Sequence, residues 1–437
     1  MVKLSLLGVA VFLCTLVPAC AQGLKESDVR YEGMQLTVVP YGKTFPIEPL
    51  AVFHDEYEAV LPAGQPNFRG PLLLRKCAWV SGSLAPGSLV ITPEGKPEVK
   101  LKEGTDYRID PLLAAVGGVE GSPYANTRCR FEYDYTYSRL DLIERKADGT
   151  LALKKGTEDR SQPSLPPTSE GATALIGIYL APNTTSLSAE NVNLIDPNFE
   201  HVPPVANAGR LATVKEKMAA GKPVAIVFFG DSITAQPPSD FRDGKGSFVD
   251  RFAKYLEGKQ GRKVVVTPAA SPVEPADGQI VIVKAGVGGD DTRRARARME
   301  KDVVSHRPDL VVVMFGVNDE NRRGNGNAVP VDEYRQNLLE IVSRVREAGG
   351  DVVLMTTSMK NLKWSSSTGR LAEYAAAARE VAKETNCCLV DNYRAWELIP
   401  KTGYHYMVFL GTCLNHPVDK GHELFFRGLK EAFERNE

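Results

Sequence analysis

The residue with the clearest chemistry is Ser232, in the segment Gly-Asp-Ser-Ile-Thr at 230–234. The apolar run at 225–229 precedes it, and a short apolar run bounded by glycine predicts a buried strand that delivers the serine into a turn. A serine hydroxyl becomes a useful nucleophile only when an adjacent base takes its proton. His416, in a proline-bounded segment near the C-terminus, is the candidate base, because histidine titrates close to neutral pH. The pair predicts nucleophilic catalysis, although Gly-Asp-Ser alone is also ordinary turn chemistry.

Three later segments strengthen the prediction. In chain order they are Gly286-Val287-Gly288-Gly289, Gly316-Val317-Asn318-Asp319 and Asn415-His416-Pro417. With the segment around Ser232, they follow the order of the four sequence blocks of the SGNH (GDSL-type) hydrolases, a family of serine esterases and lipases. The second half of the chain resembles that family. The resemblance implies a flavodoxin-like fold and hydrolysis of esters, which needs water but no metal or organic cofactor.

The resemblance also implies a set of hydrogen-bond donors. Acyl transfer develops negative charge on the former carbonyl oxygen, and that charge needs fixed donors. The family pattern supplies the backbone N–H of Ser232, the backbone N–H of Gly289 and the side-chain amide of Asn318. We expect glycine at 289 because a Cβ there would obstruct the approach to the substrate. Taken singly, Gly289 is better explained as a helix-entry glycine, and Asn318 is also typical of a turn after a strand.

One position departs from the family pattern. Most members carry an aspartate three residues before the histidine, where it orients the imidazole, and this chain has Cys413 there. A neutral thiol is a poor acceptor, and loss of the acidic triad member costs about 10⁴-fold in serine proteases. Three alternatives are open: a backbone carbonyl holds the ring in a Ser-His dyad, Asp319 or Asp419 substitutes, or the protein binds without turnover. We favour the dyad because the rest of the site is retained and Asp419 is suited to cap a helix.

The elements that must position these residues follow an alternating pattern from about residue 205. Continuous apolar runs predict strands covered on both sides, at 225–229, 280–283, 310–315, 352–355 and 388–390. Helical patterns lie at 211–220, 331–348 and 366–385. This alternation predicts an α/β fold with a doubly wound, mostly parallel sheet, in which catalytic groups lie at the carboxyl ends of the strands.

The first half has a different pattern. Short strand-like runs separated by turn residues lie at 36–39, 72–74, 88–91, 130–135 and 174–179, without long amphipathic helices. An all-β, sandwich-like or barrel-like domain is therefore predicted for 24–200. A proline-containing segment at 197–207 is the predicted boundary to a hydrolase domain at 205–437.

The N-terminus has the form of an export signal at 1–21. Lys3 is followed by an apolar stretch at 4–17, and Ala19-Cys20-Ala21 fits a cleavage site. The stretch is shorter than the roughly 20 residues that span a bilayer, and no other span is predicted. Val17-Pro18-Ala19-Cys20 also resembles a bacterial lipobox, so a lipid anchor at Cys20 is an alternative.

Composition excludes some functions and leaves others open. The formal net charge is −1, which gives no indication of a nucleic-acid partner. No cysteine and histidine spacing is typical of zinc. Cys77 and Cys129 lie in strand-like stretches and either pair or remain buried thiols.

Two further patterns have competing interpretations. The arginine-rich segment 293–298 is interpreted as the solvated face of a helix rather than a polyanion site, although Arg293 or Arg294 is within reach of an acidic sugar in that alternative. Tyr133, Tyr135 and Tyr137 alternate along one strand and are interpreted as one face of a β core rather than a sugar-stacking platform.

These observations predict an exported serine esterase, periplasmic, secreted or at the cell surface of a bacterium. By analogy with the family, the expected substrate is an O-acetylated polysaccharide or oligosaccharide. A general carboxylesterase or lipase-like enzyme is an alternative. A cell-surface glycan-binding protein with a degenerate site is the alternative from another class.

Overall fold

The computed structural model describes residues 23–271, 274–411 and 414–435. The predicted signal peptide at 1–21, the alternative lipid anchor at Cys20 and the departing position Cys413 lie outside the described residues. None of the helices in the described ranges combines the length and the apolar character needed to cross a bilayer.

The C-terminal half contains one seven-stranded sheet with the order β14-β22-β21-β18-β15-β17-β16. Strand β14 pairs antiparallel with β22, and every other pairing is parallel. The predicted doubly wound, mostly parallel sheet is therefore confirmed. The strands are β14 (Val205–Ala206), β15 (Val224–Gly230), β16 (Val264–Pro268), β17 (Ile280–Gly286), β18 (Leu310–Met314), β21 (Asp351–Met355) and β22 (Cys388–Val390).

Strand order identifies the place where a site can form. After β15 the chain forms β16 at the edge of the sheet and then β17 between β15 and β16. It next crosses to β18 on the other side of β15 and continues outward through β21 and β22. Loops leaving β15 and β18 therefore diverge, and such a switch point opens a crevice at the carboxyl ends of the strands.

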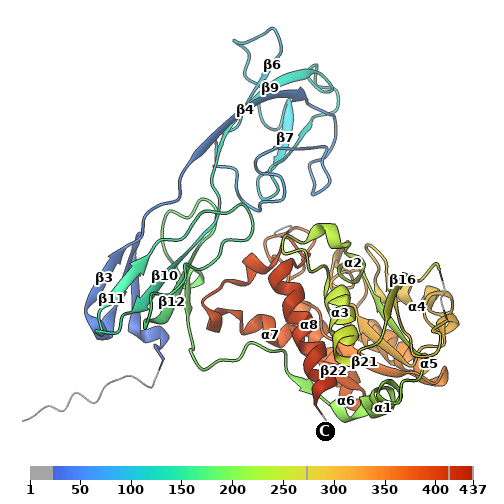
Figure 1. The fold of residues 1–437 in the computed structure, drawn as a ribbon. Helices are drawn as coiled ribbons and strands as arrows, with labels where there is room; N and C mark the ends of the chain where they lie inside the picture. Colours follow the sequence, from blue (N-terminus) through green and yellow to red (C-terminus); the bar gives the residue numbers. More distant parts are fainter. Residues whose placement is uncertain (1–22, 272–273, 412–413, 436–437) are drawn as a thin grey trace, which may run out of the picture.

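Helices pack in two groups around the sheet (Figure 1). Helices α3 and α8 pack on each other, and α4, α5 and α6 form the second group. Right-handed crossovers that run in opposite directions from β15 place these groups on opposite faces. The helices are α1 (Ala212–Ala219), α2 (Ser232–Ala235), α3 (Phe248–Gln260), α4 (Thr292–Asp302), α5 (Val331–Glu347), α6 (Leu371–Thr385), α7 (Asn392–Glu397) and α8 (Asp419–Glu434).

The N-terminal half is built from strands, as predicted, but it contains two hydrophobic cores. We name residues 29–46 with 139–194 the base lobe, and residues 53–135, which interrupt it in sequence, the insert lobe. Figure 1 shows the insert lobe at the top and the base lobe at the left. The base lobe holds β1 (Val29–Glu32), β2 (Gln35–Val38), β3 (Lys43–Pro46), β10 (Arg139–Arg145), β11 (Leu151–Lys154), β12 (Thr173–Leu180) and β13 (Val192–Leu194). The insert lobe holds β4 (Phe53–Val60), β5 (Leu72–Leu73), β6 (Val90–Pro93), β7 (Tyr107–Asp110), β8 (Ala115–Gly118) and β9 (Arg128–Tyr135).

Burial in the insert lobe settles two predictions. Tyr133 and Tyr135 are buried in its core and Tyr137 packs against it, so the tyrosine alternation marks a core face. Cys77 and Cys129 are both free, buried thiols. Burial raises the pKa of the Cys77 thiol to about 12, which is typical of an unreactive structural cysteine.

Candidate active site

Ser232 and His416 meet at the carboxyl end of β15. Ser232 is the first residue of α2, and the Asp231 side chain caps that helix by accepting from the N–H of Ile233 at 2.9 Å. His416 lies in the turn before α8, and its Nε2 is 2.7 Å from the Oγ of Ser232. The two residues are 184 positions apart in sequence, so their contact depends on the tertiary fold.

The close approach at the end of β15 needs a glycine. A Cβ on Gly230 would lie 2.1 Å from the Oγ1 of Thr234 in α2 and 2.9 Å from the carbonyl of Met314 in β18. Any side chain there would push the helix that carries Ser232 away from the sheet. The first glycine of the Gly-Asp-Ser segment thus serves packing at the switch point.

His416 is suited to accept a proton. Burial lowers the pKa of its imidazole below the ordinary value, and the carboxylate of Asp240 opposes that effect. The ring is therefore neutral near pH 7. For the Ser232 hydroxyl to donate to Nε2, the ring proton must lie on Nδ1. Among the residues that the structure describes, none forms a hydrogen bond to Nδ1 of His416.

Neither carboxylate proposed as a substitute for the usual aspartate contacts the His416 ring. Asp319 accepts from the N–H and the hydroxyl of Thr292, at 2.9 and 2.5 Å. Asp419 accepts from the N–H of Asp243 at 3.3 Å. The prediction that Asp419 caps a helix is also wrong, since Val418 is the N-cap of α8 and Asp419 is its first residue. The alternative in which Asp319 or Asp419 substitutes for the usual aspartate therefore has no support in these contacts, because both carboxylates are bonded elsewhere.

Asn318 joins the loops that follow three strands. Its Nδ2 donates to the carbonyl of Asp290 at 2.9 Å and lies 3.5 Å from the Oδ2 of Asp231. Its Oδ1 accepts from the amide of Asn321 at 3.2 Å. The asparagine is buried, and its amide is held in place between the loops after β15 and β17. Such a fixed amide is the kind of donor that can receive developing negative charge.

Gly289 lies in the turn after β17, where the N–H of Asp290 donates to the carbonyl of Val287 at 3.2 Å. Its φ is +75°, in the left-handed region that favours glycine. No protein atom lies within 4 Å of a Cβ built on Gly289, and the expectation that a Cβ would obstruct the substrate stays a prediction. The backbone conformation of the turn, rather than crowding within the protein, accounts for glycine here.

The sequence analysis did not identify Arg298 as a site residue. Its guanidinium connects the carboxyl ends of β15 and β17 with the loop after β17. Its guanidinium donates to the carbonyls of Gly230 at 3.0 Å and Ala285 at 2.9 Å, and to the carboxylate of Asp290 at 2.6 Å. It also lies over the ring of Phe229, 4.5 Å from the centroid. The spacing in sequence offered a hint, because Arg294 and Arg298 are four residues apart and therefore lie on the same helix face as each other.

The rest of the arginine-rich segment pairs with acidic side chains. Arg293 pairs with Glu333 and Arg296 with Glu340, both of α5. These ion pairs hold α4 against its neighbouring helix. The interpretation as a helix surface therefore fits Arg293 and Arg296, whereas the interpretation as solvated is wrong for Arg298.

Two buried carboxyl groups lie beneath the site. Burial raises the pKa of Asp231 to about 7, and burial likewise raises the pKa of Asp319 to about 7. Carboxyl groups with such raised pKa values cluster at functional sites, although they also occur in structural networks. In the described part of the chain there is no group of three or more residues able to hold a metal ion.

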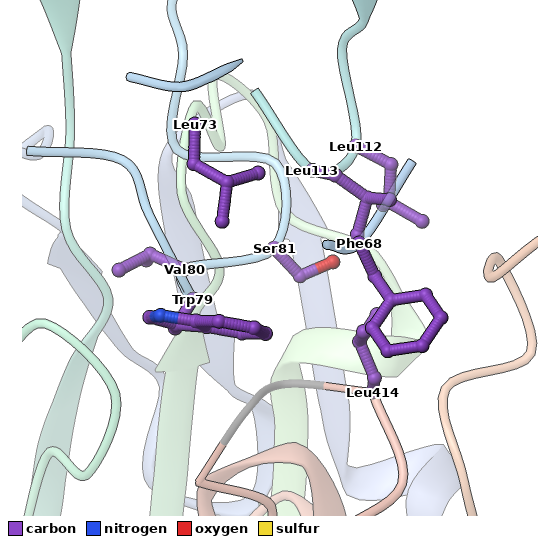
Figure 2. A pocket seen from close by; sticks show the side chains of 8 residues that line it. All are labelled: Phe68, Leu73, Trp79, Val80, Ser81, Leu112, Leu113 and Leu414. Carbon is purple, nitrogen blue, oxygen red and sulfur yellow. The ribbon is translucent and has the colours of Figure 1, made fainter. Parts of the chain in front are cut away.

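Both β lobes contact loops on the same edge of the sheet as Ser232. Leu414, two residues before His416, packs with Leu113 of the insert lobe and with Trp364. Figure 2 shows Leu414 facing a small pocket at this seam. Its lining residues are Phe68, Leu73, Trp79, Val80, Ser81, Leu112, Leu113 and Leu414.

Polar contacts extend the seam on both sides of the histidine turn. Asn361 donates its N–H to the carbonyl of Leu414 at 2.6 Å and its Nδ2 to the hydroxyl of Ser81 at 2.9 Å. From the base lobe, Asp159 forms an ion pair with Arg242, which follows α2 in the chain. The N-terminal half thus lies against the rim of the candidate site.

The fold and the site define a class: hydrolases that act on ester bonds, with a serine and a histidine at the carboxyl ends of a flavodoxin-like sheet. Residues 228–424, in the C-terminal half of the chain, match the model of the GDSL-like Lipase/Acylhydrolase family. The protein is accordingly an ester-bond hydrolase. The match begins at Phe228 and leaves the two β lobes outside it.

Individual relatives cover about the same share of the chain. An acetylxylan esterase of Geobacillus stearothermophilus is 28% identical over 222 residues, which are 48% of this chain and 94% of that protein. The uncharacterized lipoprotein YqeF of Bacillus subtilis (strain 168) is 25% identical over 237 residues, 47% of this chain and 88% of that protein. The crystal structure of a lipase/acylhydrolase from Enterococcus faecalis is 26% identical, with a TM-score of 0.37, and covers 48% of this chain and 95% of that one.

Proposed function

We propose that this hydrolase is an exported serine esterase that removes O-acetyl groups from a carbohydrate. The observation that carries the catalytic part is the 2.7 Å hydrogen bond between the Oγ of Ser232 and the Nε2 of His416 at the switch point of the sheet. Hydrolysis of an ester by this pair consumes only water, so the chemistry asks for no metal or organic cofactor.

The proposed reaction has two half-reactions. In the first, Nε2 of His416 takes the proton of the Ser232 hydroxyl while Oγ attacks the carbonyl carbon of the ester. The resulting oxyanion accepts hydrogen bonds from the N–H groups of Ser232 and Gly289 and from the Nδ2 of Asn318. The protonated imidazole then gives its proton to the leaving sugar oxygen. The C–O bond to the sugar breaks, and an acyl-serine remains.

In the second half-reaction, His416 removes a proton from a water molecule, which attacks the acyl carbonyl carbon. The same three donors hold the second oxyanion. The ring then returns the proton to the Oγ of Ser232 as the ester bond to the serine breaks, and acetate leaves. We assign His416 to a Ser-His dyad, because Asp319 and Asp419 are both bonded elsewhere.

The carbohydrate part of the proposal has separate support. The chain covers 94% of an acetylxylan esterase at 28% identity, and it adds two β lobes against the rim of the site. Residues 24–200 would then form an accessory region that limits which substrates reach Ser232. A lipase-like enzyme would need room for a long acyl chain beside Ser232, and the long-chain ester in the assay below tests for it.

Export has support of its own. Residues 1–21 have the pattern of a signal peptide, and the relative YqeF is a lipoprotein. A mature protein that begins after Ala21 would favour secretion. An N-terminus at a lipid-modified Cys20 would favour a surface anchor, and intact-mass measurement of the membrane and soluble fractions separates the two.

The enzymatic test uses three substrates. Purified protein is incubated with p-nitrophenyl acetate, with a p-nitrophenyl ester of a long fatty acid and with acetylated xylan. We expect turnover of the acetate and release of acetate from xylan, with a loss of at least about 10³-fold in Ser232→Ala. Ser239→Ala, at an exposed serine in the short 3-10 turn at 238–240 that follows α2, is the matched control and should retain activity.

The outcomes separate the candidate functions. Faster turnover of the long-chain ester would favour the lipase-like enzyme. No turnover of any ester, with retained binding to xylan, would favour the glycan-binding protein. Equal activity in Ser232→Ala and the parent would refute the serine mechanism.

A further inference from the structure

A chain of hydrogen bonds connects α2 to the turn that carries His416. Gln236 follows α2, and its Nε2 donates to the carbonyl of Pro417 at 3.3 Å. Its Oε1 lies 2.9 Å from the Nε2 of His422 in α8. The Nδ1 of His422 accepts from the backbone N–H of Phe248, the first residue of α3, at 3.0 Å. The chain therefore joins α2, α3, α8 and the histidine turn.

The donors and acceptors of this chain fit a single protonation state. Because the N–H of Phe248 can only donate, Nδ1 of His422 must accept, and the ring proton must lie on Nε2. Nε2 then donates to the Oε1 of Gln236, which leaves the amide nitrogen of Gln236 to donate to the carbonyl of Pro417. His422 is thus a neutral ring, and both polar atoms of the Gln236 amide have partners.

The surroundings keep this arrangement in place. His422 is fully buried, and Gln236 is 8% exposed. Burial lowers the pKa of His422 well below its ordinary value, and Arg251, Lys284 and the His416 ring act in the same direction. The Nζ of Lys284 also donates to the backbone carbonyl of Gln236 at 2.7 Å. Gln236 is therefore held in place by hydrogen bonds to its backbone carbonyl and to its side-chain amide.

We propose that Gln236 and His422 are positioning residues that hold the turn carrying His416 within reach of Ser232. The inference rests on the proposed function, since it needs His416 to act as the base. Pro417 directly follows His416, so a shift of Pro417 moves the backbone from which the imidazole projects. The carbonyl of His416 itself accepts from the N–H of Gly411 at 2.8 Å, so the bond from Gln236 is a second support of the same turn.

The direct test is Gln236→Met, which keeps the approximate length of the side chain and removes both hydrogen bonds. We expect kcat for p-nitrophenyl acetate to fall by about 10- to 100-fold, because a displacement of about 1 Å can cost about 100-fold in rate. KM should stay within about twofold of the parent value, because neither residue is expected to contact the substrate. A smaller active fraction would also lower the apparent kcat and leave KM unchanged, so active sites are titrated in each variant and kcat is calculated per active site.

Variants at His422 test the same connection independently. His422→Phe keeps a ring and removes both polar atoms, and it should lower kcat. His422→Gln keeps a donor toward Gln236 and should restore part of the loss. The double variant Gln236→Met with His422→Phe should lose no more than about the larger single effect, because both act through the one bond to Pro417.

Asn207→Gly is the matched control at the opposite edge of the same sheet. It removes an amide bond to the carbonyl of Cys387 of 3.1 Å at a residue whose φ is +57°, which glycine tolerates. Its kcat should equal that of the parent.

Parent-like kcat in both Gln236→Met and His422→Phe, or a loss confined to KM, overturns the positioning role. Activity that survives in Ser232→Ala overturns the proposed function instead, so the two failures are distinguishable. If Gln236→Met does not fold, the comparison of His422→Phe with His422→Gln decides.

Discussion

Replacement of Asp319 by asparagine should stabilise the protein in a pH-dependent way. The Asp319 side chain is fully buried, and burial raises its pKa from 3.8 to about 7. One oxygen accepts from Thr292, and Oδ2 has no hydrogen-bond partner among the described residues. Asparagine has nearly the same shape and cannot ionise, so it imitates the protonated acid.

The magnitude follows from the two pKa values. Because the folded-state pKa is raised, Asp319 costs no stability below about pH 3.8, and the cost grows as the pH rises toward 7. Linkage with these values gives a cost of about 2 kcal/mol at pH 5 and about 4 kcal/mol at pH 8. The advantage of Asp319→Asn over the parent should therefore increase by about 2–3 kcal/mol between pH 5 and pH 8. Any fixed cost of the amide is the same at both pH values and cancels.

Urea unfolding of parent and variant at pH 5 and pH 8, followed by tryptophan fluorescence, measures this double difference. Trp396 is fully buried in the C-terminal core and reports its unfolding. Asp332→Asn, at an exposed aspartate in the first turn of α5, is the control for the same change of residue type outside the core. An equal difference at both pH values would refute the argument from burial. The esterase activity of Asp319→Asn should be retained, and a loss near 10⁴-fold with an intact fold would restore Asp319 as the partner of His416.

Three more outcomes are expected. Asn318→Ala should lower kcat by about 10²- to 10³-fold with little effect on KM, as steady-state kinetics with p-nitrophenyl acetate would reveal, and an unchanged kcat would remove Asn318 from the oxyanion site. Asp240→Asn should shift the acid limb of kcat/KM to lower pH, because the Asp240 carboxylate raises the pKa of His416. A shift to higher pH would contradict that sign. Leu414→Ala should lower the free energy of unfolding by about 2–5 kcal/mol, because Leu414 is only 2% exposed in the seam. Urea unfolding measures it, and a loss below about 0.5 kcal/mol would mean that the seam contributes little.

Local sequence pattern was sufficient for the central strands of the sheet, but it missed the edge strands β16 and β14. The apolar runs at 225–229, 280–283 and 310–315 each form a buried strand of one parallel sheet. A strand that is apolar on both faces is stable where helices cover both faces of the sheet. Ser232 followed from the first of these runs, since a strand that ends in glycine must turn at its carboxyl end. The all-β character of the first half likewise followed from short runs separated by turn residues.

The same pattern did not separate the N-terminal half into two lobes. The insert lobe interrupts the base lobe between β3 and β10, and both are made of similar short strands. Only the contacts among strands distant in sequence distinguish one core from two.

At the site, sequence by itself determined the residue types that do chemistry: a serine after a strand, a histidine before the last helix, and a glycine and an asparagine in loops. Tertiary structure decided what surrounds them. It bonded Asp319 to Thr292, buried Arg298 beneath the strand ends and joined Gln236 to His422 across 186 positions of sequence. The physical reason is that strands and turns are set by neighbours along the chain, whereas the partner of a buried polar side chain is set by whichever elements pack around it.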